Sequence, residues 1–506
     1  MLGSLAELVP VAHRRFGEKA ALVFDGRTFS FSELHLLSNR FAAGLASLGV
    51  KPGDRVTIYA GNSWEWMVTY YGALKAGAVV NPLNVMLTPE EVEFVVEDCG
   101  AAVIVASSDK AGPLVGLKER GKIETVVVFG EDVPKWAASF DRLIEGGRDE
   151  FEIVKQASDA LSTICYTSGT TGHPKGAMLS HRSVMLNAAM TAQMHVRTER
   201  DVVVIALPLA HVYGNVIMNG AMLTGMKLVL HKAFSEEAIL EDVEAHRATM
   251  FEGVPTMYMY LLNHAGLDKY DLSSLTRCTV GGQTMPVAKM REVERRFGCP
   301  LIELWGMTEM AGLGTTHPFY GEIRHGSIGI SLPYMETRVV GVDDPSRVLP
   351  AKEVGELMCR GPLIMQGYYN NEKATRETIE PDGWLHTGDL AYMDEDGYFF
   401  IVDRKKDMIL TAGYNVYPAE LERVIAAHPS VALVAVGSVP DEAKGELAKA
   451  YIVLKQGARG DAESVLAHCR QHLAAYKVPR LVQFVADLPK TSTGKVMRRA
   501  LRQLDA

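Results

Sequence analysis

A loop rich in hydroxyl groups and glycines follows a candidate strand near residue 165. Segment 166–176 reads YTSGTTGHPKG, in which backbone N–H groups and hydroxyls can converge on phosphate oxygens and Lys175 adds a positive charge. It is not a Walker A loop, because Lys175 is followed by Gly176. A plain flexible turn is the alternative, but this composition directly after a strand favours phosphate binding. The residues concerned are Thr167, Ser168, Gly169, Thr170, Thr171, Gly172 and Lys175.

Three later segments also place charged or hydroxyl side chains beside glycine. They are WGMTE at 305–309, HTGD at 386–389 and PKTSTGK at 489–495. Taken singly, each has a plain alternative, because an Asp after Thr-Gly is most often a turn or cap residue. A lysine in a Ser/Thr/Gly turn is likewise usually a solvated charge. These segments gain meaning only as an ordered set.

That ordered set resembles the signature of the adenylate-forming superfamily, which contains acyl-CoA synthetases, firefly-type luciferases and peptide-synthetase adenylation domains. The resemblance covers essentially the whole chain. Its segments are the phosphate loop 166–176, an acyl-pocket gate at 207–214, an adenine-side loop at 280–283, the motif 305–309, a ribose segment at 386–389, a hinge at 403–406 and a lysine loop at 489–495. It implies an AMP-forming acid–thiol ligase that uses ATP, Mg²⁺ and coenzyme A. Acyl transfer to a carrier-protein phosphopantetheine, or luciferase-like oxidation, is the rival use of the fold.

Lys495 is the expected catalytic cation. A carboxylic acid is ionised at neutral pH, so adenylation needs no base on it but must bring two anions together. An ammonium that touches both the carboxylate and the α-phosphate would cancel their repulsion, an effect typically worth about 3–4 kcal/mol. By resemblance, Thr308 hydrogen-bonds the α-phosphate. Glu309, with Thr170, holds Mg²⁺ through hard oxygen ligands.

The nucleoside is expected to lie between the adenine-side loop and the ribose segment. Asp389 offers two acceptors to the ribose hydroxyls, and Arg404 adds a donor fork. Trp305 replaces the family's usual tyrosine and can still stack on adenine. The residues expected to bind the nucleotide in these segments are Gly281, Gly282, Gln283, Trp305, Gly306, Met307, Thr308, Asp389 and Arg404. Gln283 replaces the small residue that the family often has here. It could add a hydrogen bond to the nucleotide or narrow the adenine pocket, and the sequence does not decide between the two.

Two residues are implied for the second half-reaction, in which the thiol reacts. Lys406 is the hinge about which the C-terminal domain turns, with an exposed charge run as its alternative. Gly413 lines the pantetheine tunnel, where a glycine permits close approach of a ligand to the backbone.

The acyl pocket is expected to come largely from residues 207–230, which hold no Asp, Glu or Arg. An amino acid or a diacid would therefore bury an unpaired charge, at a cost of several kcal/mol. An apolar monocarboxylic acid is favoured, with a medium- or long-chain fatty acid before an aryl acid, whose ring hydroxyl Tyr213 could bind. An ordinary core would show the same methionine-rich pattern. The pocket residues are His211, Val212, Tyr213, Ile217, Met218, Gly306 and Met310, and His211 is expected to shape or gate the pocket rather than act as a base.

The elements that position these residues can be read from hydrophobic patterning. Apolar strand candidates alternate with amphipathic segments from about 160 to 305, which predicts a parallel sheet covered by helices. They are 161–167, 202–206, 227–230, 249–253, 278–280 and 301–304, with helices at 235–246 and 287–297. Residues 21–24 and 28–31 flank a hairpin turn at Asp25-Gly26.

After residue 327 the pattern predicts short antiparallel strands at 336–342, 355–360 and 397–402. After 404 it predicts helices at 418–427 and 462–475 and strands at 432–436, 450–454 and 482–485. The predicted fold class is α/β. A large N-terminal domain (1–403) has doubly wound α/β subdomains and a β-barrel section, and a small mobile α+β C-terminal domain (404–506) carries Lys495.

Composition and charge exclude several classes. The net charge is −9, but residues 404–506 hold 16 Lys and Arg against 10 Asp and Glu, a net +6, which leaves −15 elsewhere. This asymmetry suits capture of a polyanion between the two parts, or plain attraction between them. Nucleic-acid binding is not supported. Six dispersed cysteines indicate neither zinc nor disulfides and suit a cytoplasmic protein. No signal peptide or transmembrane run is expected, and a homodimer is left open.

Overall fold

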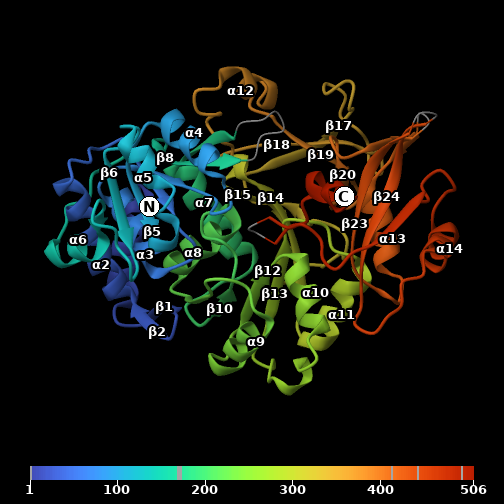
Figure 1. Cartoon of the computed structure of the whole chain (residues 1–506), viewed down its shortest axis with the longest axis horizontal. Helices are drawn as coiled ribbons and strands as arrows, with labels where there is room; N and C mark the ends of the chain where they lie inside the picture. Colours follow the sequence, from blue (N-terminus) through green and yellow to red (C-terminus); the bar gives the residue numbers. More distant parts are fainter. Residues whose placement is uncertain (1–2, 168–173, 412–413, 442–443, 492–493, 506) are drawn as a thin grey trace.

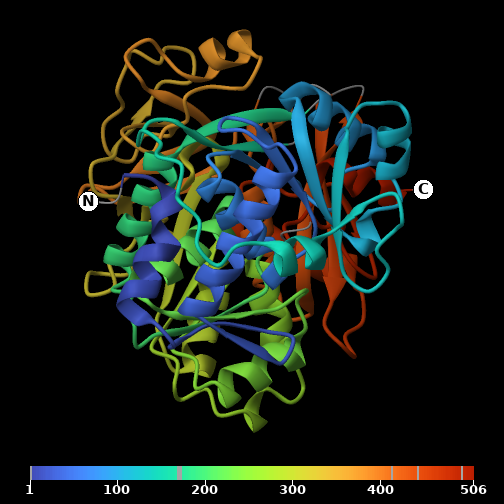
Figure 2. The same cartoon turned by 90° about the vertical axis from the view of Figure 1, so that its left-hand side faces the viewer.

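The computed structural model describes residues 3–167, 174–411, 414–441, 444–491 and 494–505. The N-terminal third lies on one side of the molecule and the C-terminal strands on the other (Figure 1). The view in Figure 2 is from the N-terminal side. Within the described ranges, no helix is both long and apolar enough to cross a bilayer.

The first sheet has seven strands in the order β7-β6-β5-β3-β4-β8-β9. All its pairings are parallel except β8–β9, which is antiparallel. The strands are β3 (Arg55–Tyr59), β4 (Val79–Pro82), β5 (Ala101–Ser107), β6 (Thr125–Phe129), β7 (Ala138–Ser139), β8 (Leu161–Thr167) and β9 (Lys175–Ser180). Its helices include α2 (Phe31–Ser47), α3 (Trp64–Lys75), α4 (Pro89–Cys99), α5 (Leu114–Glu119) and α6 (Phe140–Gly146).

The second sheet has nine strands in the order β16-β15-β14-β13-β12-β10-β11-β1-β2. The strands β1, β11, β10, β12, β13 and β14 pair in parallel, and the sheet ends in antiparallel strands at both edges. The strands are β1 (Ala20–Phe24), β2 (Arg27–Ser30), β10 (Val202–Ile205), β11 (Lys227–Leu230), β12 (Met250–Gly253), β13 (Arg277–Gly281), β14 (Leu301–Met307), β15 (Gly312–Thr316) and β16 (Ile330–Ser331). The helices nearby in sequence are α1 (Leu8–Phe16), α7 (His181–Met194), α8 (Val212–Thr224), α9 (Glu236–Ala245), α10 (Pro255–Asn263) and α11 (Val287–Phe297).

The predicted parallel sheet is therefore present, with one correction. Strand β8, expected to begin that sheet, belongs to the seven-stranded sheet and pairs there with β4. The pattern of residues 161–167 shows that the strand is buried on both faces, but an apolar run does not specify its neighbour. The hairpin at Asp25-Gly26 is confirmed, and both residues have positive φ angles of 49° and 73°.

Two smaller sheets follow. Strands β17 (Glu336–Val340), β18 (Gly355–Arg360), β19 (Leu385–Met393) and β20 (Phe399–Arg404) form an antiparallel sheet in chain order. Among the described residues its edge strands β17 and β20 do not pair, so the section expected to be barrel-like is an open sheet. Helix α12 (Glu372–Thr378) precedes β19.

The C-terminal domain has its own five-stranded sheet and its own apolar cluster. Its elements are β21 (Ile409–Thr411), β22 (Tyr414–Val416), α13 (Pro418–Ala426), β23 (Val431–Asp441), β24 (Gly445–Leu454), α14 (Ala462–His472) and β25 (Leu481–Phe484). The α+β prediction for this part is confirmed. The exact boundary at 403/404 stays a prediction.

Local signals set the helix ends. The Ser30 hydroxyl accepts a hydrogen bond from the Glu33 N–H at the start of α2, and Thr88 with Glu91 forms a capping box at the start of α4. Gly225 ends α8 with a φ of 81°, a conformation that favours glycine.

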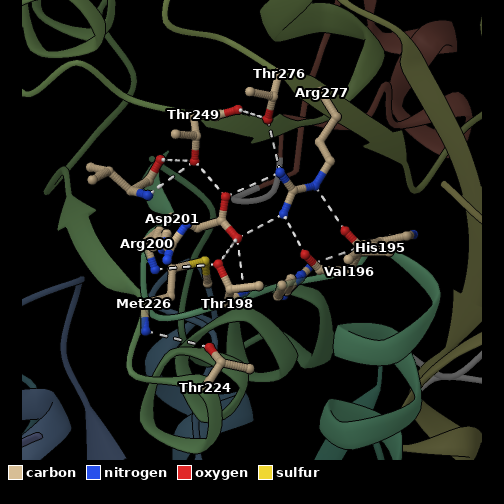
Figure 3. A network of polar contacts seen from close by, with 12 residues as sticks. His195, Val196, Thr198, Arg200, Asp201, Thr224, Met226, Thr249, Thr276 and Arg277 are labelled. Atoms are coloured by element: carbon tan, nitrogen blue, oxygen red, sulfur yellow. Dashed lines mark hydrogen bonds and ion pairs between the residues drawn. The ribbon is translucent and has the colours of Figure 1, made fainter. Parts of the chain in front are cut away.

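A polar network joins the amino ends of three parallel strands of the second sheet (Figure 3). The Arg277 guanidinium donates to both carboxylate oxygens of Asp201, at 2.8 and 3.1 Å, and to the carbonyl oxygens of His195 and Val196. The Thr249 hydroxyl donates to Asp201 at 2.8 Å. Burial alone would raise the pKa of Asp201, but the hydrogen bonds and charge of Arg277, together with the hydrogen bonds from Thr198 and Thr249, outweigh it and lower that pKa. The amino ends are thus tied together, and the carboxyl ends are left for a site.

Candidate active site

A cavity of about 920 Å³ lies beyond the carboxyl ends of β13 and β14, where the C-terminal domain meets the rest of the chain. It is lined by residues from all the expected nucleoside segments. The sequence-predicted residues that it brings together are Gly282, Gln283, Trp305, Gly306, Asp389, Arg404, Lys406 and Lys495. Ligand sites are usual at this end of a parallel sheet.

Asp389 is the centre of the cavity's polar wall. Its carboxylate accepts a hydrogen bond from the Trp305 indole N–H at 2.7 Å and forms an ion pair with the Arg404 guanidinium at 2.9 Å. Burial raises the pKa of Asp389, while Arg404, Trp305 and Lys495 oppose that rise. Trp305 therefore contributes a donor as well as a ring, which sequence reasoning did not foresee.

The Lys495 side chain enters the same cavity. A methyl group on Gly282 would lie 2.6 Å from the Lys495 Cε, so the adenine-side loop needs glycine at this point, where φ is also +92°. Burial in the cavity wall and the nearby Arg404 lower the pKa of Lys495 to about 8, and Asp389 opposes them. The lysine is therefore held close to both the adenine-side loop and the ribose segment.

His211 caps the amino end of α8, where its Nδ1 accepts a hydrogen bond from the Tyr213 N–H at 3.3 Å. Burial and the charge of Lys495 lower the pKa of His211 to about 3. A base works best when its pKa lies near the working pH. The low pKa of His211 therefore argues against a role as a base, and its expected role in shaping or gating the pocket stays a prediction.

A second group of predicted residues, those expected to bind the phosphates, lies around β9 and the end of β14. The Lys175 ammonium lies 5.3 Å from the centre of the Tyr368 ring, and the Tyr368 hydroxyl donates to Glu309 Oε1 at 2.7 Å. Thr308 and Glu309 are in the 3-10 helix Thr308–Met310 directly after β14. Thr167 donates through its hydroxyl to the Lys175 carbonyl at 3.4 Å.

Several predicted residues lie outside the described ranges. They are Ser168, Gly169, Thr170, Thr171, Gly172 and Gly413. Over the ranges that are described, no group of three His, Cys, Asp or Glu side chains is arranged to hold a metal. Glu309 still fits Mg²⁺ as one of few protein ligands, because that ion usually binds one or two carboxylates together with phosphate and water oxygens.

The expected acyl-pocket residues are buried but do not line the cavity. They are Val212, Tyr213, Ile217, Met218 and Met310, each at most 6% exposed. Of the acyl set, Gly306 does line it. Gly281, on β13, and Met307, at the end of β14, lie next to lining residues without lining the cavity themselves.

The proposal that Tyr213 binds a ring hydroxyl is not supported. The Tyr213 hydroxyl lies 2.6 Å from the Thr279 hydroxyl, which donates to Glu252 at 2.8 Å. Glu252 in turn forms a fully buried ion pair with Arg197 at 2.8 Å. The hydroxyl of Tyr213 therefore points into the core, where Thr279 is its partner, and spacing along the sequence gives no signal of this.

Sequence reasoning missed two residues of the site. Glu303 lines the cavity at 3% exposure, its Oε2 has no partner among the described residues, and burial raises its pKa to about 8. Tyr368 bridges Lys175 and Glu309. Glu303 could have been suspected from its place two residues before Trp305, whereas nothing in the sequence around Tyr368 marks it.

The hinge region is held by charged side chains. Asp403 is buried, which raises its pKa to about 6, and it accepts a hydrogen bond from the Ala419 N–H at 2.8 Å. Lys405 pairs with Glu356 at 3.2 Å. Lys406 is exposed beside Arg404, and partial burial with that charge lowers its pKa. An exposed side chain that pairs with no other side chain of the described ranges suits a residue about which two domains turn.

Comparison with known proteins gives consistent matches. The protein-family model described as AMP-binding enzyme matches residues 10–369. The family model described as AMP-binding enzyme C-terminal domain matches residues 420–495. A long-chain-fatty-acid–CoA ligase of Bacillus subtilis is 33% identical over 98% of this chain and 94% of its own. A feruloyl-CoA synthase of Amycolatopsis is 35% identical over 98% of both chains.

A solved structure of MatB from Rhodopseudomonas palustris with ATP bound has a TM-score of 0.91 to this chain, 32% identity and 99% coverage of both chains. The apo form of the same protein has a TM-score of 0.81 at the same coverage. The arrangement of this chain is thus closer to that of the ATP-bound relative.

Proposed function

The chain belongs to the AMP-binding enzyme family and is an ATP-dependent acid–CoA ligase, and we propose that Lys495 is the cation that drives adenylation of an apolar monocarboxylic acid. The observation that carries this proposal is the position of Lys495 in the cavity, against Gly282 and near Asp389. In the first half-reaction a carboxylate oxygen bonds to the α-phosphorus of ATP and pyrophosphate leaves. In the second, the thiol of coenzyme A attacks the acyl carbonyl and AMP leaves.

The Lys495 ammonium offsets the repulsion between the carboxylate and the α-phosphate. Electrostatic groups of this kind act strongly in a site from which water is excluded, and removing one typically costs about a thousandfold in rate. The desolvation that lowers the pKa of Lys495 also strengthens its attraction for both anions once they bind. Bound substrate anions would in turn raise that pKa and keep the lysine charged.

The remaining nucleotide contacts are assigned by chemistry. Asp389 and Arg404 hold the ribose, Trp305 stacks on adenine, and the carboxyl of Glu303 is suited to accept a hydrogen bond from the adenine amino group. Thr308 binds the α-phosphate and Lys175 the outer phosphates. Bound at Glu309 and Thr170, Mg²⁺ would neutralise charge on the phosphates.

Thioester formation requires the C-terminal domain to turn about Lys406. We take 404–506 as the moving part, with Lys495 withdrawn and Gly413 brought to the pantetheine. The net charge of +6 on that part suits the phosphates of coenzyme A.

A medium- or long-chain fatty acid is the favoured substrate. Residues 207–230 hold no Asp, Glu or Arg to pair with a second charge on the acid. The Tyr213 hydroxyl already has Thr279 as its partner, which weighs against recognition of a ring hydroxyl. The relative named as a long-chain-fatty-acid–CoA ligase agrees with a fatty acid, whereas the relative named as a feruloyl-CoA synthase keeps an aryl acid as the alternative.

The test is a panel of carboxylic acids assayed for ATP-dependent pyrophosphate release, with and without coenzyme A. Fatty acids of increasing length, cinnamate and benzoate derivatives, malonate and amino acids form the panel. We expect the highest kcat/KM with a fatty acid and the lowest with charged acids. A preference for malonate or an amino acid would overturn the substrate proposal.

A further inference from the structure

Two hydrogen bonds hold the lysine loop (489–495) and the residue after it against the large domain. The Gln283 Oε1 accepts a hydrogen bond from the Val496 N–H at 3.2 Å. The Thr256 hydroxyl, on α10, donates to the Gly494 carbonyl oxygen at 2.6 Å. These contacts flank Lys495 on both sides in the sequence, so each of them can hold its backbone in the cavity.

A third contact lies one turn further along α10. The Tyr260 hydroxyl donates to Asp487 at 3.3 Å and also contacts the Lys490 ammonium, which lies 5.0 Å from the centre of the Tyr260 ring. The Asp487 side chain is 60% exposed, so this contact is screened by water and weaker than the other two.

The lysine loop is also closed on itself. The Thr491 N–H donates to the Lys495 carbonyl at 2.7 Å, and the Lys495 N–H donates to the Thr491 hydroxyl at 3.1 Å. Because Thr491 and Lys495 are joined in this way, these two residues of the loop approach or leave the cavity together. Contacts at its edge therefore act on the position of Lys495.

We propose that Thr256, Tyr260 and Gln283 form a latch that holds the lysine loop in the cavity and sets how readily it leaves between the two half-reactions. This inference rests on the proposed function, because it assumes that Lys495 must be in place for adenylation and withdrawn for thioester formation. It assigns Gln283 a hydrogen-bonding role across the domain interface. The latch residues are positioning residues, since they act through Lys495.

A latch has opposite effects on the two half-reactions. Each hydrogen bond stabilises the lysine-in arrangement, and one ordinary hydrogen bond corresponds to about a fivefold change in an equilibrium. Losing Thr256 or Gln283 should therefore slow adenylation about fivefold. The same loss should leave thioester formation unchanged or make it faster, because the loop must leave before the thiol reacts. Loss of the Tyr260 hydroxyl should cost about twofold at most.

The experiment measures the half-reactions separately in the full-length enzyme. Pyrophosphate release without coenzyme A reports adenylation in a single turnover, and preformed acyl-adenylate mixed with coenzyme A reports thioester formation. Thr256→Val removes the hydroxyl at nearly constant shape, and Thr256→Ser restores it. Gln283→Ala removes the acceptor, and Gln283→Glu keeps an oxygen in its place. Asn263→Ala, an exposed position at the end of α10 whose amide donates to the Met259 carbonyl oxygen within the helix, is the matched control.

The latch predicts a lower adenylation rate at unchanged KM for ATP in Thr256→Val and Gln283→Ala, with recovery in Thr256→Ser and Gln283→Glu and no change in Asn263→Ala. A raised KM for ATP with unchanged adenylation rate in Gln283→Ala would instead make Gln283 an adenine contact and overturn its part in the latch. Equal loss in both half-reactions would overturn the latch as a whole. If the unaltered enzyme releases no pyrophosphate with any acid, the proposed function fails instead.

Discussion

Replacing Trp305 by phenylalanine would separate the two contributions of this side chain to nucleotide binding. The phenyl ring keeps an apolar face for adenine, but it cannot donate to Asp389 as the indole N–H does at 2.7 Å. Asp389 is 4% exposed, so the oxygen that loses this donor has little access to water. The carboxylate also forms an ion pair with the Arg404 guanidinium, at 2.9 Å.

The size of the effect follows from these contacts. A hydrogen bond to a buried charged group contributes about 1.5–3 kcal/mol, which is roughly 10- to 100-fold in a binding constant. Losing the donor should also raise the pKa of Asp389 further above its ordinary value, because Trp305 is one of the groups that oppose the effect of burial. ATP binding by Trp305→Phe should therefore weaken at least about tenfold, and the loss should grow as the pH falls towards the raised pKa.

The assay is the Kd of ATP by calorimetry at several pH values, supported by the KM for ATP in pyrophosphate release. Trp66→Phe is a matched control, because the buried Trp66 indole N–H has no hydrogen-bond partner within the described part of the chain. It should reduce stability but leave the Kd unchanged. Wild-type affinity for ATP in a folded Trp305→Phe variant would refute the reasoning about Asp389.

Three further outcomes are expected. Lys495→Ala should abolish adenylation, with a loss of about a thousandfold in single-turnover pyrophosphate release, yet largely spare thioester formation from a preformed acyl-adenylate; equal loss in both would contradict the assignment. The kcat/KM for adenylation should fall as the pH rises through about 8, since the pKa of Lys495 is lowered to that value in the free enzyme and the charged form is lost above it; a flat profile from pH 7 to 10 would contradict this. Arg277→Met should lower the free energy of unfolding by about 3–5 kcal/mol in urea titrations, because it leaves the Asp201 carboxylate without its cation. That last effect should shrink as the pH falls, because the pKa of Asp201 is lowered in the folded state and protonation removes the stranded charge; a constant loss down to low pH would contradict this.

The sequence by itself predicts the chemistry of the segments, and it located most of the elements that carry them. Hydroxyls and glycines directly after a strand indicate phosphate binding whatever surrounds them, since the backbone supplies the donors. The spacing of apolar residues located α9 and α11, because apolar side chains that recur about every 3.6 residues fall on one face of a helix. The ordered set of segments identified the family, and it predicts a place for Lys495 in the reaction.

The tertiary structure alone decided which groups meet. Trp305 and Asp389 are 84 residues apart, and their hydrogen bond depends on how β14 and β19 approach one another. The sequence of β8 is that of a buried strand, which could belong to either parallel sheet. Only the structure shows that it pairs with β4 in the seven-stranded sheet. Tyr213 turned its hydroxyl to Thr279 because a polar group buried in a core needs a partner. Residue types and spacing thus indicate the chemistry that a side chain is capable of. Its interaction partners depend on the packing of segments that are far apart in the sequence.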